Sequence, residues 1–310
     1  MPQRPPAFSS PRFCRLLIAF FASVVLAFVP WANAREMDVP GGKLEVEFAS
    51  PPTVTLEKNI TRWIQNSARA VSDYYGTFTV RRATLRIMLT TGHEVSGGQA
   101  FGYDGALIKI SVGRSATDAD LVEDWQLTHE MLHLGFPDVP DQHLWIEEGL
   151  ATYVEPIARC RVGLITPERV WGDLVEGLPQ GEPAAGDQGL DHTHTWGRTY
   201  WGGALFCLRA DVEIRRRTGN RFGLEHVLRA IHAAGGTIES QWKLDRAIAI
   251  GDAATGVPVL RELYDEMKAS PVTVDLPALW KQLGVLRSGQ TVKFDPAAPL
   301  GAIRKAITVR

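Results

Sequence analysis

Two histidines four residues apart, with a glutamate directly after the first, constrain this chain more than any other feature: His129-Glu130-x-x-His133. Side chains four residues apart lie on one face of an α-helix, so both imidazole rings reach a single metal ion if the segment is helical. Neutral imidazole suits Zn²⁺ at about 2.0–2.1 Å. Glu130 lies beside the first ligand, where it can act as general base toward a zinc-activated water. The motif therefore predicts a helix, a zinc site and a base.

The residues around the motif also indicate a helix. Residues 118–126 are acidic and amphipathic, and their apolar side chains recur at a helical spacing that continues to Leu132. Gly135 and Pro137 follow closely and predict that the helix ends just after the motif. We therefore expect one helix to run from about residue 118 through the motif.

A catalytic zinc takes three protein ligands and keeps one position open. Residues 145–157 have the apolar stripe of a second helix, and Glu147 and Glu148 on this helix both have the right chemistry. His143 precedes the helix in a short loop and is a third candidate. The residues alone leave the choice open.

The two segments together resemble the gluzincin peptidases, in particular the glycyl aminopeptidase family and the M1-type aminopeptidases. The matching residues are His129-Glu130-x-x-His133 followed by Trp145-x-x-Glu148-Gly149-x-Ala151-x-Tyr153. In those families the glutamate directly before the glycine is the third zinc ligand, which implies Glu148. The 14 residues between His133 and Glu148 form a shorter connection than in the larger aminopeptidases.

A second match lies at residues 199–205, which resemble the Tyr-x-Lys-Gly-Ala segment that opens a long helix in the family. The family's tyrosine donates a hydrogen bond to the oxyanion, a role that the resemblance assigns to Tyr200. Such a donor stabilises a transition state by about 2.7–4 kcal/mol. Gly202 replaces the family's lysine. Without the resemblance, Tyr200 would be interpreted as an ordinary core tyrosine.

The resemblance covers about residues 118–235. Within it, residues 211–219 and 224–229 match further glycyl aminopeptidase segments. The three consecutive arginines Arg215, Arg216 and Arg217 need no catalytic role, because basic residues at the end of a helix suit its dipole. We expect all three to form a solvated face.

One feature of M1-type aminopeptidases is missing from the sequence. Those enzymes hold the substrate's free amine with a Gly-x-Met-Glu-Asn motif, and this chain has none. In gluzincins a strand before the active helix lies beside the cleft, and its edge can pair with an extended peptide. Residues 97–105 precede the helix here, but their glycines indicate a hairpin loop, in which Asp104 could supply a carboxylate. Aminopeptidase and endopeptidase action both stay open.

Residues 1–34 have the features of a secretory signal peptide. A region with three arginines precedes an apolar core at residues 16–29. That core is shorter than the roughly 20 residues that a membrane-spanning helix needs. Ala32-Asn33-Ala34 forms an A-x-A cleavage site. We predict cleavage after Ala34, a periplasmic or secreted protein, and no stable membrane anchor afterwards.

Removal of this peptide leaves 276 of the 310 residues, with 30 basic and 35 acidic side chains. No basic stripe indicates a nucleic-acid partner. Two cysteines remain, Cys160 and Cys207, and an oxidising compartment permits but does not require a disulfide between them. His192 and His194 precede Tyr200 closely and are candidates for substrate binding, although residues two apart do not share a helix face.

The expected fold class is α+β, similar to the thermolysin-like catalytic domain of gluzincins. A small mixed α/β N-terminal lobe with the active-site helix (about residues 35–137) precedes a mostly α-helical C-terminal lobe (about residues 138–310). Periodicity places strands at residues 43–48, 84–89 and 107–112, helices at 55–75, 167–178, 227–234, 242–250, 259–267 and 276–283, and strands or extended arms at 291–294 and 303–309.

These features together predict an exported zinc metallopeptidase that acts on peptide or protein substrates. One Zn²⁺ per chain binds His129, His133 and Glu148, with Glu130 as base and Tyr200 as oxyanion donor. Two alternatives stay open: a non-catalytic exported protein that contains zinc, and a zinc hydrolase of a non-peptide amide. The sequence leaves the oligomeric state open, and also whether the native ion is zinc or another divalent metal.

Overall fold

A five-stranded mixed sheet covered by one long helix forms the N-terminal part of the protein. The structure, a computed structural model, describes residues 32–289 and 291–309. The strands are β1 (Ala32–Val39), β2 (Gly42–Phe48), β3 (Arg82–Thr90), β4 (Val95–Phe101) and β5 (Ala106–Gly113), in the spatial order β1-β2-β3-β5-β4. Strands β2, β3 and β5 are parallel, whereas β1 and β4 pair antiparallel at the two edges.

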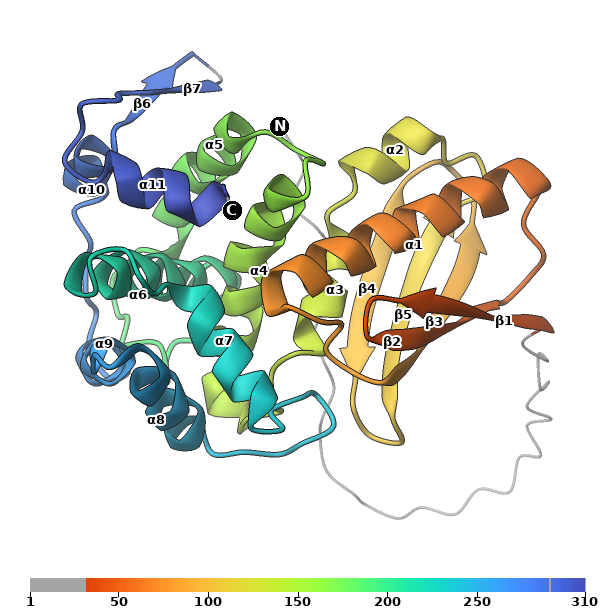
Figure 1. The fold of residues 1–310 in the computed structure, drawn as a ribbon, viewed down its shortest axis with the longest axis horizontal. Coiled ribbons are helices and arrows are strands. Elements are labelled where there is room, and N and C mark those ends of the chain that lie inside the picture. Colours follow the sequence, from red (N-terminus) through yellow and green to blue (C-terminus); the bar gives the residue numbers. More distant parts are fainter. Residues whose placement is uncertain (1–31, 290, 310) are drawn as a thin grey trace. The chain divides into compact units, whose positions relative to one another are not determined.

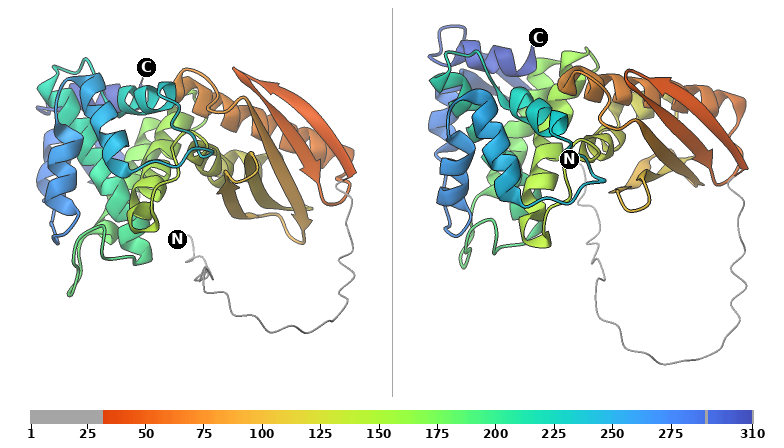
Figure 2. Two further views of the ribbon diagram at one scale, coloured as in Figure 1. Left: turned by 90° about the horizontal axis from the view of Figure 1, so that it is seen from below. Right: turned by 60° about the horizontal axis from the view of Figure 1, so that its bottom comes forward.

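Alternating burial explains how the sheet and the helix α1 (Val54–Tyr75) fit together. In β2, the buried side chains Leu44, Val46 and Phe48 alternate with more exposed ones, and β3 and β5 repeat the pattern. Period-two burial gives the sheet one apolar face, and α1 packs its buried stripe against that face (Figures 1 and 2). Thr53 caps the start of α1, and Gly76 ends it in a left-handed conformation.

The predicted strands and the helix at residues 55–75 are confirmed, but the hairpin loop expected at residues 97–105 is wrong. Most of that run is strand β4, and only residues 102–105 form the turn. A β-bulge between Ser96 and Gln99 accommodates the glycines, with Gly97 at a φ of +64°. Gly-rich sequence here thus marks a bulged edge strand. Strand β1 was not predicted.

The single helix expected from residue 118 through the motif is also wrong. Two helices occur instead, α2 (Asp118–Glu123) and α3 (Gln126–His133). Asp124 interrupts the run in an extended conformation, and its carboxylate accepts hydrogen bonds from the Gln126 and Leu127 backbone N–H groups, both at 3.1 Å. The Asp124 side chain thus satisfies the first N–H groups of α3.

The C-terminal part is mostly helical, as predicted. Its longer helices are α4 (Leu144–Arg161), α5 (Pro167–Gly177), α6 (Gly203–Arg217), α7 (Leu224–Ala233), α8 (Leu244–Thr255), α9 (Val259–Met267), α10 (Leu276–Leu283) and α11 (Gly301–Thr308). Short helices η1 (Asp141–His143), η2 (Leu178–Gly181) and η3 (Gly197–Gly202) and a hairpin of β6 (Val285–Ser288) and β7 (Thr291–Phe294) complete it.

The tail differs from the expectation at one point. Residues 303–309 were expected as a strand or extended arm, but α11 occupies most of that segment (Figure 1). Its buried Ile303 and Ile307 lie four residues apart, a spacing that also fits a helix face. The expectation for residues 291–294, which form β7, is confirmed.

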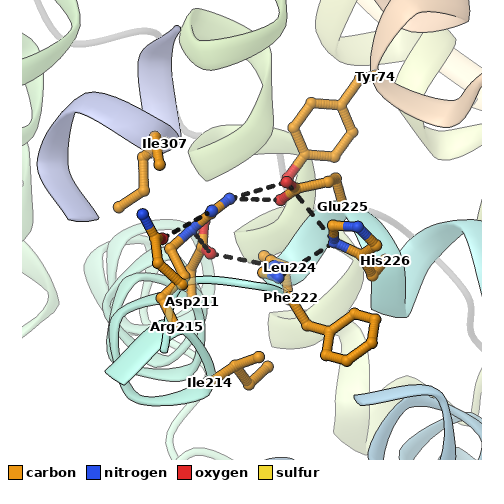
Figure 3. Close-up of polar contacts among 12 residues, drawn as sticks. Tyr74, Asp211, Ile214, Arg215, Phe222, Leu224, Glu225, His226 and Ile307 are labelled. Carbon is orange, nitrogen blue, oxygen red and sulfur yellow. Dashed lines mark hydrogen bonds and ion pairs between the residues drawn. The ribbon is translucent and has the colours of Figure 1, made fainter. Parts of the chain in front are cut away.

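An ion-pair network, centred on Arg215, ties the helical part together (Figure 3). The solvated face expected for Arg215 to Arg217 holds only for Arg216 and Arg217, which are exposed. Arg215 is 3% exposed and donates to Asp211 at 2.8 Å and to both oxygens of Glu225 at 2.7 and 2.9 Å. These partners lie on α6 and α7, so Arg215 joins the two helices.

The described residues belong to one compact unit, so the α+β class is confirmed, while the lobe boundary near residue 137 stays a prediction. Of the predicted signal peptide, residues 1–31 lie outside the described residues. The regular pairing of β1 with β2 runs from Arg35 to Val39, so cleavage after Ala34 would leave it intact. Cys160 and Cys207 are buried free thiols. No helix between residues 32 and 309 is long and apolar enough to cross a membrane.

Candidate metal centre

Two neighbouring helices supply the candidate ligands. Helix α3 carries His129 and His133, which project one turn apart with ring centroids 4.9 Å from each other. Helix α4 carries Glu148, whose Oε2 lies 3.2 Å from Nε2 of His129 and 3.6 Å from Nε2 of His133. The ligating atoms of all three residues lie within 4.8 Å of one another.

This spacing fits a tetrahedral metal site. Ligands at about 2.0–2.1 Å from a zinc ion lie roughly 3.3–3.4 Å apart in tetrahedral geometry. The separations of Glu148 from the two histidines bracket that value. Two nitrogens and one carboxylate oxygen are also the donor set of a catalytic zinc with an open fourth position. The residues present therefore fit zinc.

The electrostatics of Glu148 and His133 also favour a cation at this position. Burial favours the neutral form of Glu148, but the positive charge of His133 and hydrogen bonds from both histidines outweigh it and lower the pKa of Glu148. Burial likewise opposes a charge on His133, yet Glu148 and Glu130 raise the pKa of His133 to about 9. A carboxylate that attracts a proton to a neighbouring imidazole attracts a divalent cation for the same Coulombic reason.

The two other candidates for the third ligand make different contacts. Glu147 turns away, and its Oε1 accepts a hydrogen bond from the Val139 backbone N–H at 3.0 Å, which anchors the loop between α3 and α4. His143 is buried, and its Nδ1 lies 2.9 Å from Oδ1 of Asp191. The structure thus brings Glu148, but neither of the alternatives, into the group with His129 and His133.

Glu130 is buried beside the candidate ligands and next to the edge of the sheet. Burial raises its pKa, and the two histidines act in the opposite direction. Strand β4 passes so close that a Cβ on Gly98 would lie 2.7 Å from Oε1 of Glu130. Only a glycine allows the edge strand to approach the carboxylate this closely.

Tyr200 lies on the π-helix η3, at the start of the long helix that the sequence predicted. Its ring stacks on that of His129 with a centroid distance of 6.3 Å and an interplanar angle of 20°. Burial, together with Glu148 and Glu130, raises the pKa of Tyr200 and favours the protonated phenol, which can donate a hydrogen bond. Single π-turns often occur at functional sites.

Two glycines explain how α4 and α6 come together. A Cβ on Gly149 would lie 2.3 Å from the backbone of Gly203, and a Cβ on Gly203 would lie 1.9 Å from the carbonyl oxygen of Trp145. The helices therefore touch backbone to backbone at this point. This contact brings η3 and Tyr200 next to Glu148 on α4.

His192 and His194 are exposed on the loop that leads into η3. Neither belongs to the group of metal-ligating side chains found among the described residues. Their role in substrate binding stays a prediction. The buried neighbour Asp191 instead accepts hydrogen bonds from Trp145 and Tyr264, each at 2.8 Å, and so anchors the base of this loop.

Sequence reasoning missed several residues that shape the site. Asp124 caps α3 and also accepts a hydrogen bond from Nε1 of Trp63 at 3.0 Å. The preference for aspartate before the first turn of a helix was a usable signal. Trp125 and Trp196, whose rings pack against site residues, gave no such signal in the sequence.

No protein-family model and no curated protein sequence matches this chain. Solved structures do. An aminopeptidase N family protein from Idiomarina loihiensis superposes with a TM-score of 0.64 at 16% identity, over 82% of this chain and 49% of that one. A variant of the M1 zinc metallopeptidase from Deinococcus radiodurans superposes with a TM-score of 0.51 at 14% identity, over 79% of this chain and 53% of that one.

The chain therefore has the fold of the M1 zinc metallopeptidases, as the resemblance to gluzincins predicted. It spans about half the length of those two proteins. Likeness at these identities concerns the fold, so the activity has to be argued from the residues of the site.

Proposed function

We propose that this chain is an exported, zinc-dependent metallopeptidase that hydrolyses peptide bonds. The observation that carries the proposal is the convergence of ligating atoms from His129, His133 and Glu148 within 4.8 Å. Glu130 and Tyr200 lie beside this group, as a base and an oxyanion donor require. The fold shared with zinc metallopeptidases supports the same conclusion.

Each residue has a distinct task in the proposed reaction. When bound, zinc acts as a Lewis acid toward the scissile carbonyl and lowers the pKa of a coordinated water. Glu130 takes a proton from the attacking water and later delivers it to the leaving amine. Tyr200 donates a hydrogen bond to the oxygen on which negative charge develops.

The edge strand β4 favours an extended peptide or protein as substrate. Beyond its pairing with β5, β4 leaves one side without a neighbouring strand in the sheet. An extended peptide that adds to this edge would lie near Glu130, because β4 packs directly against the Glu130 side chain at Gly98. Aminopeptidase and endopeptidase action are distinguished by comparing the cleavage of the same peptides with a free and with an N-acetylated amino terminus. An aminopeptidase requires the free amine, whereas an endopeptidase cleaves both forms.

Metal content tests the site directly. We expect elemental analysis of protein that starts at Arg35 to give about one zinc per chain, and clearly less for Glu148→Ala. Full retention of zinc by Glu148→Ala would identify a different third ligand, with Glu147 and His143 as the next candidates. Absence of zinc from the wild-type protein, purified without chelators, would contradict the proposal.

Glu130→Gln separates an enzyme from a binding protein that merely contains zinc. Because Glu130 is not a ligand, the variant should keep zinc, whereas loss of the base should lower the rate of peptide hydrolysis about 10²–10⁴-fold. A peptide library read by mass spectrometry, with Glu147→Gln as a neighbouring control, measures this. An equal rate in Glu130→Gln and wild type would remove Glu130 from the mechanism.

Export is part of the same proposal and rests on the features of residues 1–34. The mature N-terminus should be Arg35 in protein recovered from the periplasm or the medium. N-terminal sequencing checks it, and recovery of the full-length chain from the cytoplasm would contradict it.

A further inference from the structure

Two tryptophans frame the candidate metal centre from opposite ends of a series of rings. Trp125 packs edge-to-face on His129 at 5.4 Å, and His129 in turn stacks with Tyr200 at 6.3 Å. Trp196 stacks on the other side of that series, 5.8 Å from Tyr200 at an interplanar angle of 26°. Each indole therefore touches a residue that acts at the reacting centre.

Both indoles are half exposed although tryptophan is highly buried on average in folded proteins. Trp125 is 51% and Trp196 is 50% exposed. Such exposure leaves a large apolar surface in water, at a cost that grows with the area. Exposed apolar groups at a reactive site are typical of a surface that a ligand covers.

The backbone that carries Trp125 is held in place. The preceding residue, Asp124, binds Nε1 of Trp63 and caps α3. The following residue, Gln126, donates from Nε2 to the carbonyl oxygen of Val95 at 2.6 Å, which ties this corner to strand β4. Trp125 therefore lies where the edge strand begins.

The backbone that carries Trp196 is anchored by a buried ion pair. Arg198, two residues further on, binds Oδ2 of Asp187 through Nε at 2.7 Å and also donates to the carbonyl oxygen of Gly181. In addition, a Cβ on Gly197 would lie 2.3 Å from the carbonyl oxygen of Gln180, so the chain packs tightly here. Both indoles are thus presented by rigid backbone, which lowers the entropy lost when a ligand binds.

We propose that Trp125 and Trp196 form an apolar subsite pair that selects peptides with an aromatic or large aliphatic side chain next to the scissile bond. The inference rests on the proposed peptidase function and specifies its substrate class. A peptide whose carbonyl lies at the metal carries its neighbouring side chains a few ångströms to either side. Trp125 and Trp196 are the exposed rings that contact His129 and Tyr200, so they are the side chains to which the inference assigns these positions.

The test compares binding of two hydroxamates that differ only in their side chain. Phenylalanine hydroxamate and alanine hydroxamate are titrated calorimetrically into the zinc-loaded wild type, Trp125→Ala and Trp196→Ala. We expect the wild type to prefer the phenylalanine compound, and at least one variant to lose about tenfold of that preference. Trp125→Phe and Trp196→Phe should restore most of it, because they keep an aromatic ring.

A matched control removes an equally exposed apolar side chain elsewhere. Leu286 on β6 is also 50% exposed, and Leu286→Ala should keep the wild-type preference. Circular dichroism and zinc content show whether each variant is folded and loaded. Equal preference in wild type and both alanine variants, with zinc bound, overturns the inference. Equal preference in all three proteins together with tighter binding of glycopeptides would also overturn the inference, and it would indicate a subsite for sugars instead.

The same samples separate failure of the inference from failure of the proposed function. If zinc is bound and peptides are cleaved without regard to side-chain size, the inference fails and the proposed function stands. If the hydroxamate preference depends on the indoles but no peptide is cleaved, the subsite stands and the proposed function fails. If wild type binds no zinc, both fail.

Discussion

The candidate metal centre and the Arg215 network are both buried clusters of charged side chains, but their charges are balanced in different ways. Around Arg215, two arginines (Arg161 and Arg215) face two carboxylates (Asp211 and Glu225), and each nitrogen of the Arg215 guanidinium has a partner. The charges of the two arginines and the two carboxylates balance one another, and the network holds helices together.

The candidate metal centre lacks that balance of permanently charged groups. Two carboxylates, Glu130 and Glu148, share the space with two imidazoles, and Nδ1 of His129 is buried with no hydrogen-bond partner among the described residues. Glu148 and Glu130 favour a proton on His133, and the same negative charge favours a divalent cation in place of that proton. Around Arg215 the carboxylates instead face arginines, which keep their charge and join α6 to α7.

The largest expected effect on stability comes from removing Arg215 from its ion-pair network. Arg215→Ala leaves Asp211 and Glu225 buried and largely uncompensated, so we expect a loss of about 3–5 kcal/mol in the free energy of unfolding, measured by urea denaturation. Arg216→Ala, one residue away but exposed, should change it by no more than about 0.5 kcal/mol. Equal effects of the two variants would contradict the division into two kinds of cluster.

At the candidate metal centre we expect a large effect on activity and a small effect on stability. Tyr200→Phe removes one hydroxyl and should lower kcat about 10²–10³-fold, equivalent to about 2.7–4 kcal/mol in the transition state. Zinc content and the urea midpoint should stay near the wild-type values, because Tyr200 is neither a ligand nor fully buried. A rise in KM with unchanged kcat would assign Tyr200 to substrate binding instead.

Replacement of Asp124 should have a smaller effect, and this effect should appear both in the stability of the protein and in its zinc affinity. Asp124→Ala removes the cap of α3 and the partner of Trp63, so we expect a loss of about 1–2 kcal/mol in stability. Zinc affinity should fall as well, because α3 carries His129 and His133, two of the candidate ligands. Asp124→Asn, which keeps an acceptor for the cap, should recover most of both, and competition with a chromogenic chelator measures the affinity.

The ligand helix and its partner were predictable because their signals are local. Residues four apart meet on any α-helix, so His129 and His133 needed no tertiary information. The break at Asp124 was not predictable from periodicity, because the apolar spacing continues through it into α3. Resemblance, rather than spacing, favoured Glu148 over Glu147, which differ only in the direction that α4 turns them.

Arg215 shows why the remaining errors arose. In the sequence it is the first of three identical residues at a helix end, and nothing local distinguishes it from Arg216. Its burial depends on Glu225, which α7 brings back from ten residues further along the chain. The same reason applies to β4. Its glycines are typical of a loop, and only the pairing with β5 shows that the segment is a strand.

The contact between Gly149 and Gly203 sets a limit on how this protein can change. One backbone contact fixes the spacing of two helices, and that spacing separates Glu148, the proposed metal ligand, from Tyr200, the proposed oxyanion donor. A side chain added at either glycine pushes both groups apart together. A change in the distance between α4 and α6 would therefore alter both the affinity for the ion and the stabilisation of the transition state. Redesign of the protein for a bulkier reacting group would therefore have to change the proposed subsite residues Trp125 and Trp196, because the contact between Gly149 and Gly203 leaves no room for a larger side chain.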